Sequence, residues 1–440
     1  MTVQYVSQYS SEYKNNVSQL PGQSLEWLKS FRAEAFDRFS STGFPSLREE
    51  EWRYTNVSAI EKKLFSPLAI VDTGVVDKSW LTDFVLDDCY TVVLVNGHFS
   101  SDLSSLDDLS TDVAVLSMAQ ALDQKPETVQ KYLAQAVSNE EHSFVAFNSA
   151  WFTDGLFIHI PSKIVLDKPV QLVHLTTQAE CLSTTRNLLI VDEMAEAKVI
   201  ETFVGVDSAY LSAAVTEVFV EKNAELTLFK VQSEGDKAYH FGGTYVKQAR
   251  DSRFNHHNFA FGGLLARNDI HTNLDVASEC DLNGLSLGIK RQHIDNHTRI
   301  KHLQPHAISR ELYKGVFNQR ARGVFQGRVF VAEDAQKTDS EMNNRNLLLS
   351  ADAEVDTKPQ LEIYADDVKC AHGVTVGQLD EKSIFYLQSR CVDKETARNI
   401  LTFAFANEMV DKVQLTSLRE LLLGQLLKRF PQAGVDKQWL

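Results

Sequence analysis

Cysteine is scarce in this sequence, which has five among its 440 residues. They are Cys89, Cys181, Cys280, Cys370 and Cys391. No two of them form a C-x-x-C pair. A disulfide framework, or a zinc or iron–sulfur site made from this chain's cysteines alone, is therefore not expected.

Basic residues are outnumbered, because 44 Lys and Arg stand against 59 Asp and Glu, which gives a formal net charge of −15. A nucleic acid or an anionic membrane would need a basic footprint. Apolar runs of membrane-spanning length are absent, and residues 1–23 lack the apolar stretch of a signal peptide. We therefore expect a cytoplasmic protein that binds neither nucleic acid nor a membrane.

The sequence also lacks the common catalytic motifs. It has no phosphate-binding G-x-x-x-x-G-K-[ST] loop, no H-E-x-x-H zinc motif and no dinucleotide-binding fingerprint. A nucleotide-driven step would have to be supplied by a partner. These absences predict a protein that is not itself an enzyme.

The overall composition is that of a globular protein, with 43% hydrophobic and 23% charged residues. The length predicts two or three structural units. Changes in residue pattern divide the chain into an N-terminal helical or mixed region (1–160), a core (161–392) and a C-terminal helical region (393–440).

Apolar residues recur at helical spacing toward both ends of the chain. Leu28, Phe31, Ala35 and Phe39 predict an N-terminal helix, and residues 115–138 have helical character as well. At the other end, residues 394–430 predict a helix pair with a broad apolar stripe. Such a stripe either caps the core or docks a partner, and spacing alone does not decide between them.

The core contains short alternating apolar segments that recur at a fixed interval. One series of segment positions is separated by 27, 27, 28 and 28 residues, and a second by 28, 27, 29 and 26. The first consists of Leu172, Val199, Leu226, Phe254 and Leu282, and the second of Ile190, Val218, Tyr245, Leu274 and Ile300. Units of about 27 residues with two strands each are typical of a stacked solenoid. The pattern favours a mainly β protein with a β-solenoid core.

A meander of hairpins is the alternative to a solenoid, because residues 221–224 could form a hairpin turn. The near-constant interval favours stacking instead. Beyond Ile300 the interval drifts, and only residues 361–364 and 384–387 still have the pattern of clear strands.

Seven of the 13 histidines lie between His256 and His306. His256 and His257 are adjacent in a predicted strand, so their side chains point to opposite faces and cannot bind one metal together. The remaining group of interest is His293, His297, His302 and His306. Neutral imidazoles could bind a metal or a cluster, but strand and turn histidines are more often satisfied by the surrounding protein.

Cys370 and His372 form the most specific candidate site. In a strand, residues two apart point to the same face, so the thiol and the imidazole would lie side by side. Sulfur with nitrogen suits iron, an iron–sulfur fragment or zinc, yet two ligands do not complete a tetrahedral site. The pair could also be a Cys–His nucleophile, or simply a small buried Cys beside a His.

The sequence around this pair resembles the SufB/SufD family of the SUF iron–sulfur cluster assembly system, and its SufD branch in particular. The resemblance rests on residues 367–380 (DVKCAHGVTVGQLD) and 384–390 (IFYLQSR), and also on 51–55 (EWRYT) and 297–306 (HTRIKHLQPH). The SufB branch usually has an acidic residue after C-x-H, where this chain has Gly373. Cys391 stands where a glycine is common.

This resemblance implies a right-handed parallel β-helix between N-terminal and C-terminal helical regions. It implies a non-catalytic scaffold subunit that pairs with SufB through the β-helix and binds the ABC ATPase SufC through C-terminal helices, within 394–430. His372 and Cys370 would contribute to iron or cluster handling at the SufB interface. No cofactor is expected to be tightly bound to the isolated chain, only a transient iron or iron–sulfur cluster in the complex.

Two other functions are compatible with a β-solenoid. The chain could hold a cluster by itself, as a SufB-like scaffold, although its five scattered cysteines argue against this. It could also be a β-helix enzyme that degrades polysaccharides, but such enzymes need a groove with catalytic carboxylates and are commonly secreted. The sequence leaves open whether the isolated chain is a homodimer, and what Cys391 and the histidine group do.

Overall fold

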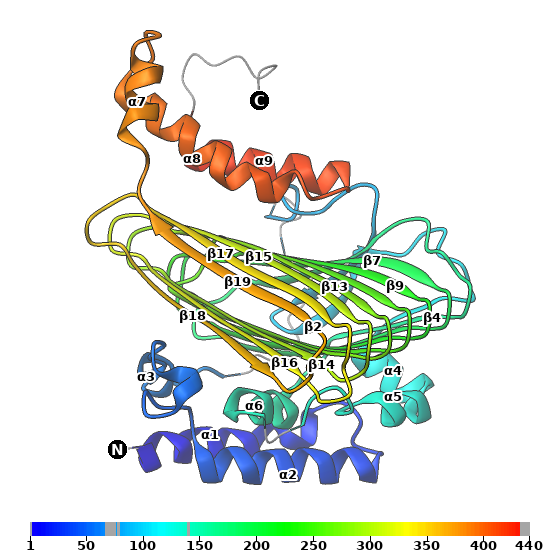
Figure 1. Ribbon diagram of the computed structural model, residues 1–440. Helices are drawn as coiled ribbons and strands as arrows, with labels where there is room; N and C mark the ends of the chain where they lie inside the picture. Colours follow the sequence, from blue (N-terminus) through cyan, green and yellow to red (C-terminus); the bar gives the residue numbers. More distant parts are fainter. Residues whose placement is uncertain (1, 67–75, 77–79, 139–140, 432–440) are drawn as a thin grey trace.

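The computed structural model describes residues 2–66, 76, 80–138 and 141–431, and it consists of a parallel β-solenoid with helices on two opposite sides (Figure 1). One sheet has ten strands in the order β19-β17-β15-β13-β11-β9-β7-β5-β1-β2, and the other has nine in the order β18-β16-β14-β12-β10-β8-β6-β4-β3. From β4 onward, even strands lie in the nine-stranded sheet and odd strands in the ten-stranded sheet, so each coil of the solenoid contributes one strand to each. This confirms the predicted β-solenoid with its flanking helices.

The strands of the ten-stranded sheet are β1 (Tyr90–Val95), β2 (His98–Ser105), β5 (Val170–Thr176), β7 (Glu196–Gly205), β9 (Glu225–Ser233), β11 (Arg253–Ala260), β13 (Glu279–Gly288), β15 (Ile308–Phe317), β17 (Asp339–Leu348) and β19 (Lys369–Gly377). Those of the nine-stranded sheet are β3 (Ala114–Ser117), β4 (Leu156–Ile160), β6 (Leu182–Val191), β8 (Leu211–Val220), β10 (Tyr239–Gln248), β12 (Leu265–Leu274), β14 (His293–His302), β16 (Arg322–Val331) and β18 (Glu354–Ile363).

The pairing register has an interval close to that of the predicted series, but its residues differ. Of the first series only Leu226 and Phe254 are ladder partners, and Val199 pairs with Leu228. From β4 and β5 onward all pairs are parallel; one coil advances 26 residues from Phe254 to Cys280, and another advances 32 from Arg322 to Glu354. Coils toward the C-terminus contain more residues, so the interval between ladder partners grows there while the solenoid continues. The turn at 221–224 joins β8 in one sheet to β9 in the other, so the hairpin alternative is wrong.

The turns between coils repeat the same backbone conformation. Asn223 and Ala277 both adopt a left-handed φ, 57° and 54°. Each donates its backbone N–H to a carbonyl of the next coil, from Asn223 to Arg250 at 3.2 Å and from Ala277 to Pro305 at 3.0 Å. The turns are therefore part of the ladder that stacks the coils.

The N-terminal region covers the outer face of the nine-stranded sheet. Its helices are α1 (Thr2–Asn16), η1 (Val17–Gln19), α2 (Glu26–Thr42), η2 (Glu50–Trp52), α3 (Ser58–Glu61), α4 (Met118–Gln124), α5 (Pro126–Tyr132) and α6 (Ser143–Trp151). Rings from α1, α2 and α6, including Tyr9, Phe39 and Trp151, pack against one another. The helical pattern predicted over 115–138 is divided in the structure, because residues 114–117 form β3 before α4 begins.

The C-terminal helices α8 (Lys394–Val410) and α9 (Thr416–Arg429) lie on the outer face of the ten-stranded sheet, and α7 (Glu381–Gln388) stands away from it (Figure 1). The strand predicted at 384–387 is wrong, because these residues belong to α7. Asp380 caps this helix by accepting from the N–H groups of Lys382 and Ser383, which favours helix over strand. None of the helices described is long and apolar enough to cross a membrane.

Candidate functional site

Cys370 and His372 lie on β19, the last strand of the ten-stranded sheet. In the ladder they are paired with Ser340 and Met342 of β17. Met342 is buried in the apolar core inside the solenoid, and Cys370 packs against that core. Since paired side chains in a parallel ladder share a face, both candidate ligands point toward the interior at the end of the solenoid. Among the residues described, no coil lies beyond them, and His372 is exposed while Cys370 is half-buried.

The thiol of Cys370 is held in its neutral form by its surroundings. Burial raises the pKa of Cys370, the Asp339 carboxylate raises it further, and a backbone hydrogen bond from Ser340 opposes them. Asp339 is itself paired with Arg310 at 2.9 Å. A metal cation bound to this sulfur would favour the thiolate over the neutral thiol, because coordination lowers the pKa of a thiol.

The pair supplies two donor atoms and no complete coordination shell. Among the residues described, no group of three or more His, Cys, Asp or Glu side chains is arranged to hold a metal ion. A thiol with an imidazole suits iron or zinc, but a tetrahedral site would need further ligands from outside this group.

Gly373, next to His372, lies close to a side chain of the neighbouring strand. A Cβ atom there would lie 2.8 Å from Oδ1 of Asn343. Asn343 is held in place because its Nδ2 donates to Oε1 of Glu341 at 2.7 Å. A side chain at this position would therefore require the Asn343 side chain to shift.

The structure does not bring the four histidines of the predicted group together. His293 and His297 lie on the outer face of β14, whereas His302 lies on the opposite face, inside the solenoid, and is fully buried. His306 occupies a left-handed turn with φ of 67°. The alternating pattern around residues 298–300 correctly predicted a strand, which is β14. Because side chains alternate between the two faces of a strand, His302 is separated from His293 and His297.

Two sequence motifs that are far apart in the chain meet on the outer face of β14. We call this contact the N-terminal clasp; it comprises Glu51, Thr55, Arg267, Asp295 and His297. Thr55 Oγ1 donates to Asp295 Oδ2 at 2.5 Å, and the Arg267 guanidinium lies 3.7 Å from the Trp52 ring centre. Nη1 of Arg267 also donates to the Glu51 carbonyl at 2.6 Å. Both motifs were identified in the sequence, but their contact was not predicted, because no spacing along the chain reveals it.

His297 carries the central charge of the clasp. Its Nε2 lies 3.0 Å from Asp295 Oδ1, and its Nδ1 lies 3.3 Å from Glu51 Oε2. Burial and Arg267 oppose protonation, but Asp295 and Glu51 outweigh them and raise the pKa of His297. In turn, the hydrogen bond from His297 lowers the pKa of Glu51 to about 2. Despite its burial, Asp295 also has a pKa lowered to about 2, by His297 and Arg267.

The clasp should therefore weaken as the pH rises. The pKa of His297 is higher in the folded state, so its stabilisation is complete below the unfolded value near 6.5 and is lost as pH rises through the folded value. We expect hydrogen exchange of residues 49–57 to accelerate more between pH 6 and pH 9 than the intrinsic rate does. In His297→Gln this extra acceleration should vanish; an identical profile in both proteins would contradict the prediction.

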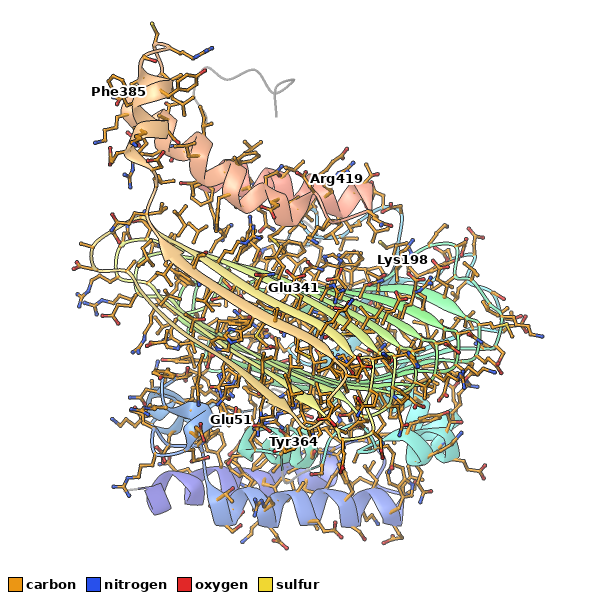
Figure 2. The ribbon with its side chains drawn as sticks, viewed as in Figure 1. Glu51, Lys198, Glu341, Tyr364, Phe385 and Arg419 are labelled. Carbon is orange, nitrogen blue, oxygen red and sulfur yellow. The ribbon has the colours of Figure 1, made fainter. Side chains whose placement is uncertain are left out.

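The exposed aromatic residues of the C-terminal region lie on α7. Phe385 is 72% exposed and Tyr386 is 57% exposed, while Ile384 is the buried residue of this helix. Figure 2 shows Phe385 on α7, away from the solenoid. The Arg390 guanidinium lies 4.7 Å from the Tyr386 ring centre.

Cys391 closes the C-terminal end of α7 in the left-handed conformation, with φ of 68°. Its N–H donates to the Gln388 carbonyl at 3.0 Å, and the N–H of Val392 donates to the Leu387 carbonyl at 3.2 Å. This is the Schellman arrangement, whose left-handed position favours glycine. A cysteine here is strained by roughly 1 kcal/mol relative to glycine.

Comparisons with known proteins cover most of the chain. Residues 174–405 match the family model described as the SufBD core domain of SUF-system FeS cluster assembly, and residues 3–172 match the SufBD protein N-terminal region. The iron–sulfur cluster assembly protein SufD of Escherichia coli is 32% identical over 398 residues, 89% of this chain and 90% of that protein.

Two further relatives have similar coverage. An iron–sulfur cluster assembly SufBD family protein of Synechocystis is 30% identical over 402 residues, 88% of each chain. SufD of Bacillus subtilis is 23% identical over 430 residues, 92% of this chain and 94% of that protein. The chain therefore belongs to the SufB/SufD family of SUF-system iron–sulfur cluster assembly proteins, and within it the chain is SufD-like.

Proposed function

We propose that this chain is a non-catalytic scaffold subunit of a cytoplasmic SufB–SufC–SufD complex, in which it helps to handle iron or a nascent iron–sulfur cluster. The observation that carries the proposal is the pair of Cys370 and His372 at the uncovered end of the solenoid. The pair offers two donors to a metal and leaves the remaining positions to another chain. Iron or cluster is cargo here, so the isolated chain needs no resident metal.

The last coil is the proposed contact surface for SufB. In the part of the chain that the structure describes, no strand pairs with the outer edge of β18 or of β19. Unpaired edges are templates for a partner strand. Exposed apolar side chains adjoin them, namely Ile363, Tyr364 and Val376; Figure 2 shows Tyr364 at the end of β18. A second chain at this end would bring its own ligands beside His372.

The proposed contact surface for SufC is α7 together with the exposed side of α8. The broad apolar stripe predicted within 394–430 packs on the ten-stranded sheet through residues such as Phe403, Met409 and Leu422. The buried part of that stripe serves as a cap, whereas Leu421, Leu423 and Leu427 are only partly buried. Phe385 and Tyr386 remain exposed next to it, and large exposed aromatic residues are common anchors of protein interfaces.

Co-expression with SufB and SufC of the same genome tests the assembly directly. Size-exclusion chromatography with mass determination should find one complex that contains all three chains. A chain that elutes alone in their presence would mean that the family fold is retained without the proposed assembly.

His372→Ala should leave the fold and the complex intact but reduce cluster assembly at least about tenfold, because a lost ligand costs at least as much as a lost outer-sphere partner. The imidazole is exposed on an edge strand, so little packing is lost. The measurement is iron and sulfide content with visible absorption after anaerobic reconstitution of the complex. Thr375→Ala, also exposed on β19, is the matched control. Wild-type cluster yield in His372→Ala would refute the ligand role.

A further inference from the structure

Glu311 is a carboxylic acid inside the solenoid, on β15 in the C-terminal coils. The residue is 3% exposed, and among the residues described neither Oε1 nor Oε2 has a hydrogen-bond partner. Its ladder neighbours are Leu282 of β13 and Met342 of β17, which both belong to the apolar core. A negative charge at this place would have neither water nor a partner to stabilise it.

The polar groups near this carboxyl group supply no counter-charge. Thr298 of β14 is close enough to lower the pKa of Glu311, yet its hydroxyl oxygen has no hydrogen bond of ordinary length and angle. Burial raises the pKa of Cys280 on β13 and of Tyr313 on β15 well above their usual values, so both are neutral. Burial also lowers the pKa of His302 on β14 to about 4, so this imidazole is neutral at neutral pH as well.

The two remaining strands beside Glu311 contribute no titratable group. On β17 its neighbour is Met342, whose sulfur would lie 2.5 Å from a Cβ atom on Gly327 of β16. Met342 also separates Glu311 from His372 in the ladder of β15, β17 and β19. Because burial dominates, the pKa of Glu311 is raised to about 8, and the carboxyl group is neutral in the closed solenoid at neutral pH.

The position of Glu311 determines which part of the chain its ionisation would affect. Among the strands described, β16 to β19 form the last coils, between β15 and the open end of the solenoid. A buried carboxylate needs water, and the shortest path to water is through separation of these coils from β15. Opening at the end of a stacked array requires less free energy than unfolding of the whole array.

We propose that Glu311 makes the closed state of the last coils depend on protonation: while its carboxyl group is neutral, β16 to β19 stay packed on β15, and transfer of the proton to water favours their opening. The last coils hold Cys370 and His372, so the consequence for a partner surface rests on the proposed function. The opening itself is a property of the isolated chain, and it is tested without a partner, iron or a cluster.

The sign of the pH effect follows from the pKa of Glu311 in the two states. It is about 8 in the closed state, and it returns to the ordinary value of 4.5 in an opened, hydrated state. The closed state therefore binds the proton more tightly, so its advantage is complete below pH 4.5 and is lost as the pH rises toward about 8. Between these values the opening constant should increase by up to about tenfold per pH unit.

Hydrogen exchange of the isolated full-length chain measures the opening constant once the intrinsic exchange rate is divided out. In the wild type we expect the protection of peptides from β17 and β19 to fall at least about tenfold from pH 6 to pH 8. Glu311→Gln, which is neutral at every pH, should show no such fall. Glu341→Gln is the matched control, because it makes the same change on β17 at an exposed side chain, and its profile should equal that of the wild type.

Equal pH profiles in the wild type and in Glu311→Gln would overturn the proposal. A fall of the same size in peptides from β7 and β9 would also overturn it, because the whole solenoid would then open at once. If Glu311→Gln does not fold, Glu311→Met decides the question on the same scale, since an apolar side chain of similar size should remove the pH dependence.

Infrared difference spectra give a second readout that does not depend on exchange. The spectrum of the wild type minus that of Glu311→Gln, or of Glu311→Met, should contain the carbonyl band of a protonated carboxylic acid at neutral pH. A difference spectrum without this band would contradict a neutral Glu311 and with it the proposal.

Discussion

Asp295→Ala should destabilise the protein by about 3–5 kcal/mol, since removing one member of a buried ion network leaves the others uncompensated. The carboxylate is completely buried and has three partners in the N-terminal clasp. It lies 3.0 Å from His297 Nε2, accepts from Arg267 Nη1 at 3.2 Å and accepts from Thr55 at 2.5 Å. Without it, Arg267 and His297 face each other inside the protein with less negative charge between them.

Urea unfolding followed by circular dichroism measures this change, and hydrogen exchange shows whether residues 49–57 open first. Asp192→Ala is the matched control, because Asp192 also pairs with a histidine, His159 at 2.8 Å, but its side chain is 28% exposed. An exposed pair contributes about 0–1 kcal/mol. Equal destabilisation by the two substitutions would mean that the clasp is no more than a surface ion pair.

If α7 contacts SufC as proposed, the double substitution Phe385→Ala with Tyr386→Ala should weaken that binding about 100-fold or more while the chain stays folded. Aromatic anchors at the centre of an interface contribute about 2 kcal/mol or more each, and each 1.4 kcal/mol is a factor of ten in affinity. Both rings are largely exposed in the free chain, so little internal packing is lost. Isothermal titration of the purified chain with SufC measures the loss.

Ile384→Ala separates binding from folding of α7, because Ile384 is the buried residue of that helix. It should loosen α7 and lower the melting temperature, whereas the double substitution should not. Removal of all residues after Cys391 would be a poor test, since it would also uncover the apolar sheet face beneath α8 and α9. Unchanged SufC affinity in the double variant would place the contact elsewhere.

The β-solenoid was predictable because its cause is local and repeated. Each coil presents alternating apolar residues at nearly the same interval. Leu226 and Phe254 of the predicted series are ladder partners, whereas Val199 pairs with Leu228, two residues beyond the predicted position. The strand predicted at 384–387 failed for an equally local reason. Four consecutive residues with strand preference cannot outweigh an Asp380 cap and the helix that it begins.

The candidate site was predictable only in part. The identities and spacing of Cys370 and His372 already place a thiol and an imidazole on one face of a strand. Their exposure could not be read from that spacing, because it depends on the absence of a further coil. The same holds for the C-terminal leucine stripe, because only the structure shows which of its residues pack on the ten-stranded sheet.

The sequence by itself determined the repeat, the terminal helices, the lack of a nucleotide-binding loop and the presence of a Cys–His pair. These features depend on residue type and on separations of a few residues or one coil. The tertiary structure alone decided which distant groups meet: Glu51 with His297, 246 residues apart, and His302 with Ser340 through Ser309. Such contacts arise from the stacking of whole coils and from the packing of one region on another, which no local pattern in the chain specifies.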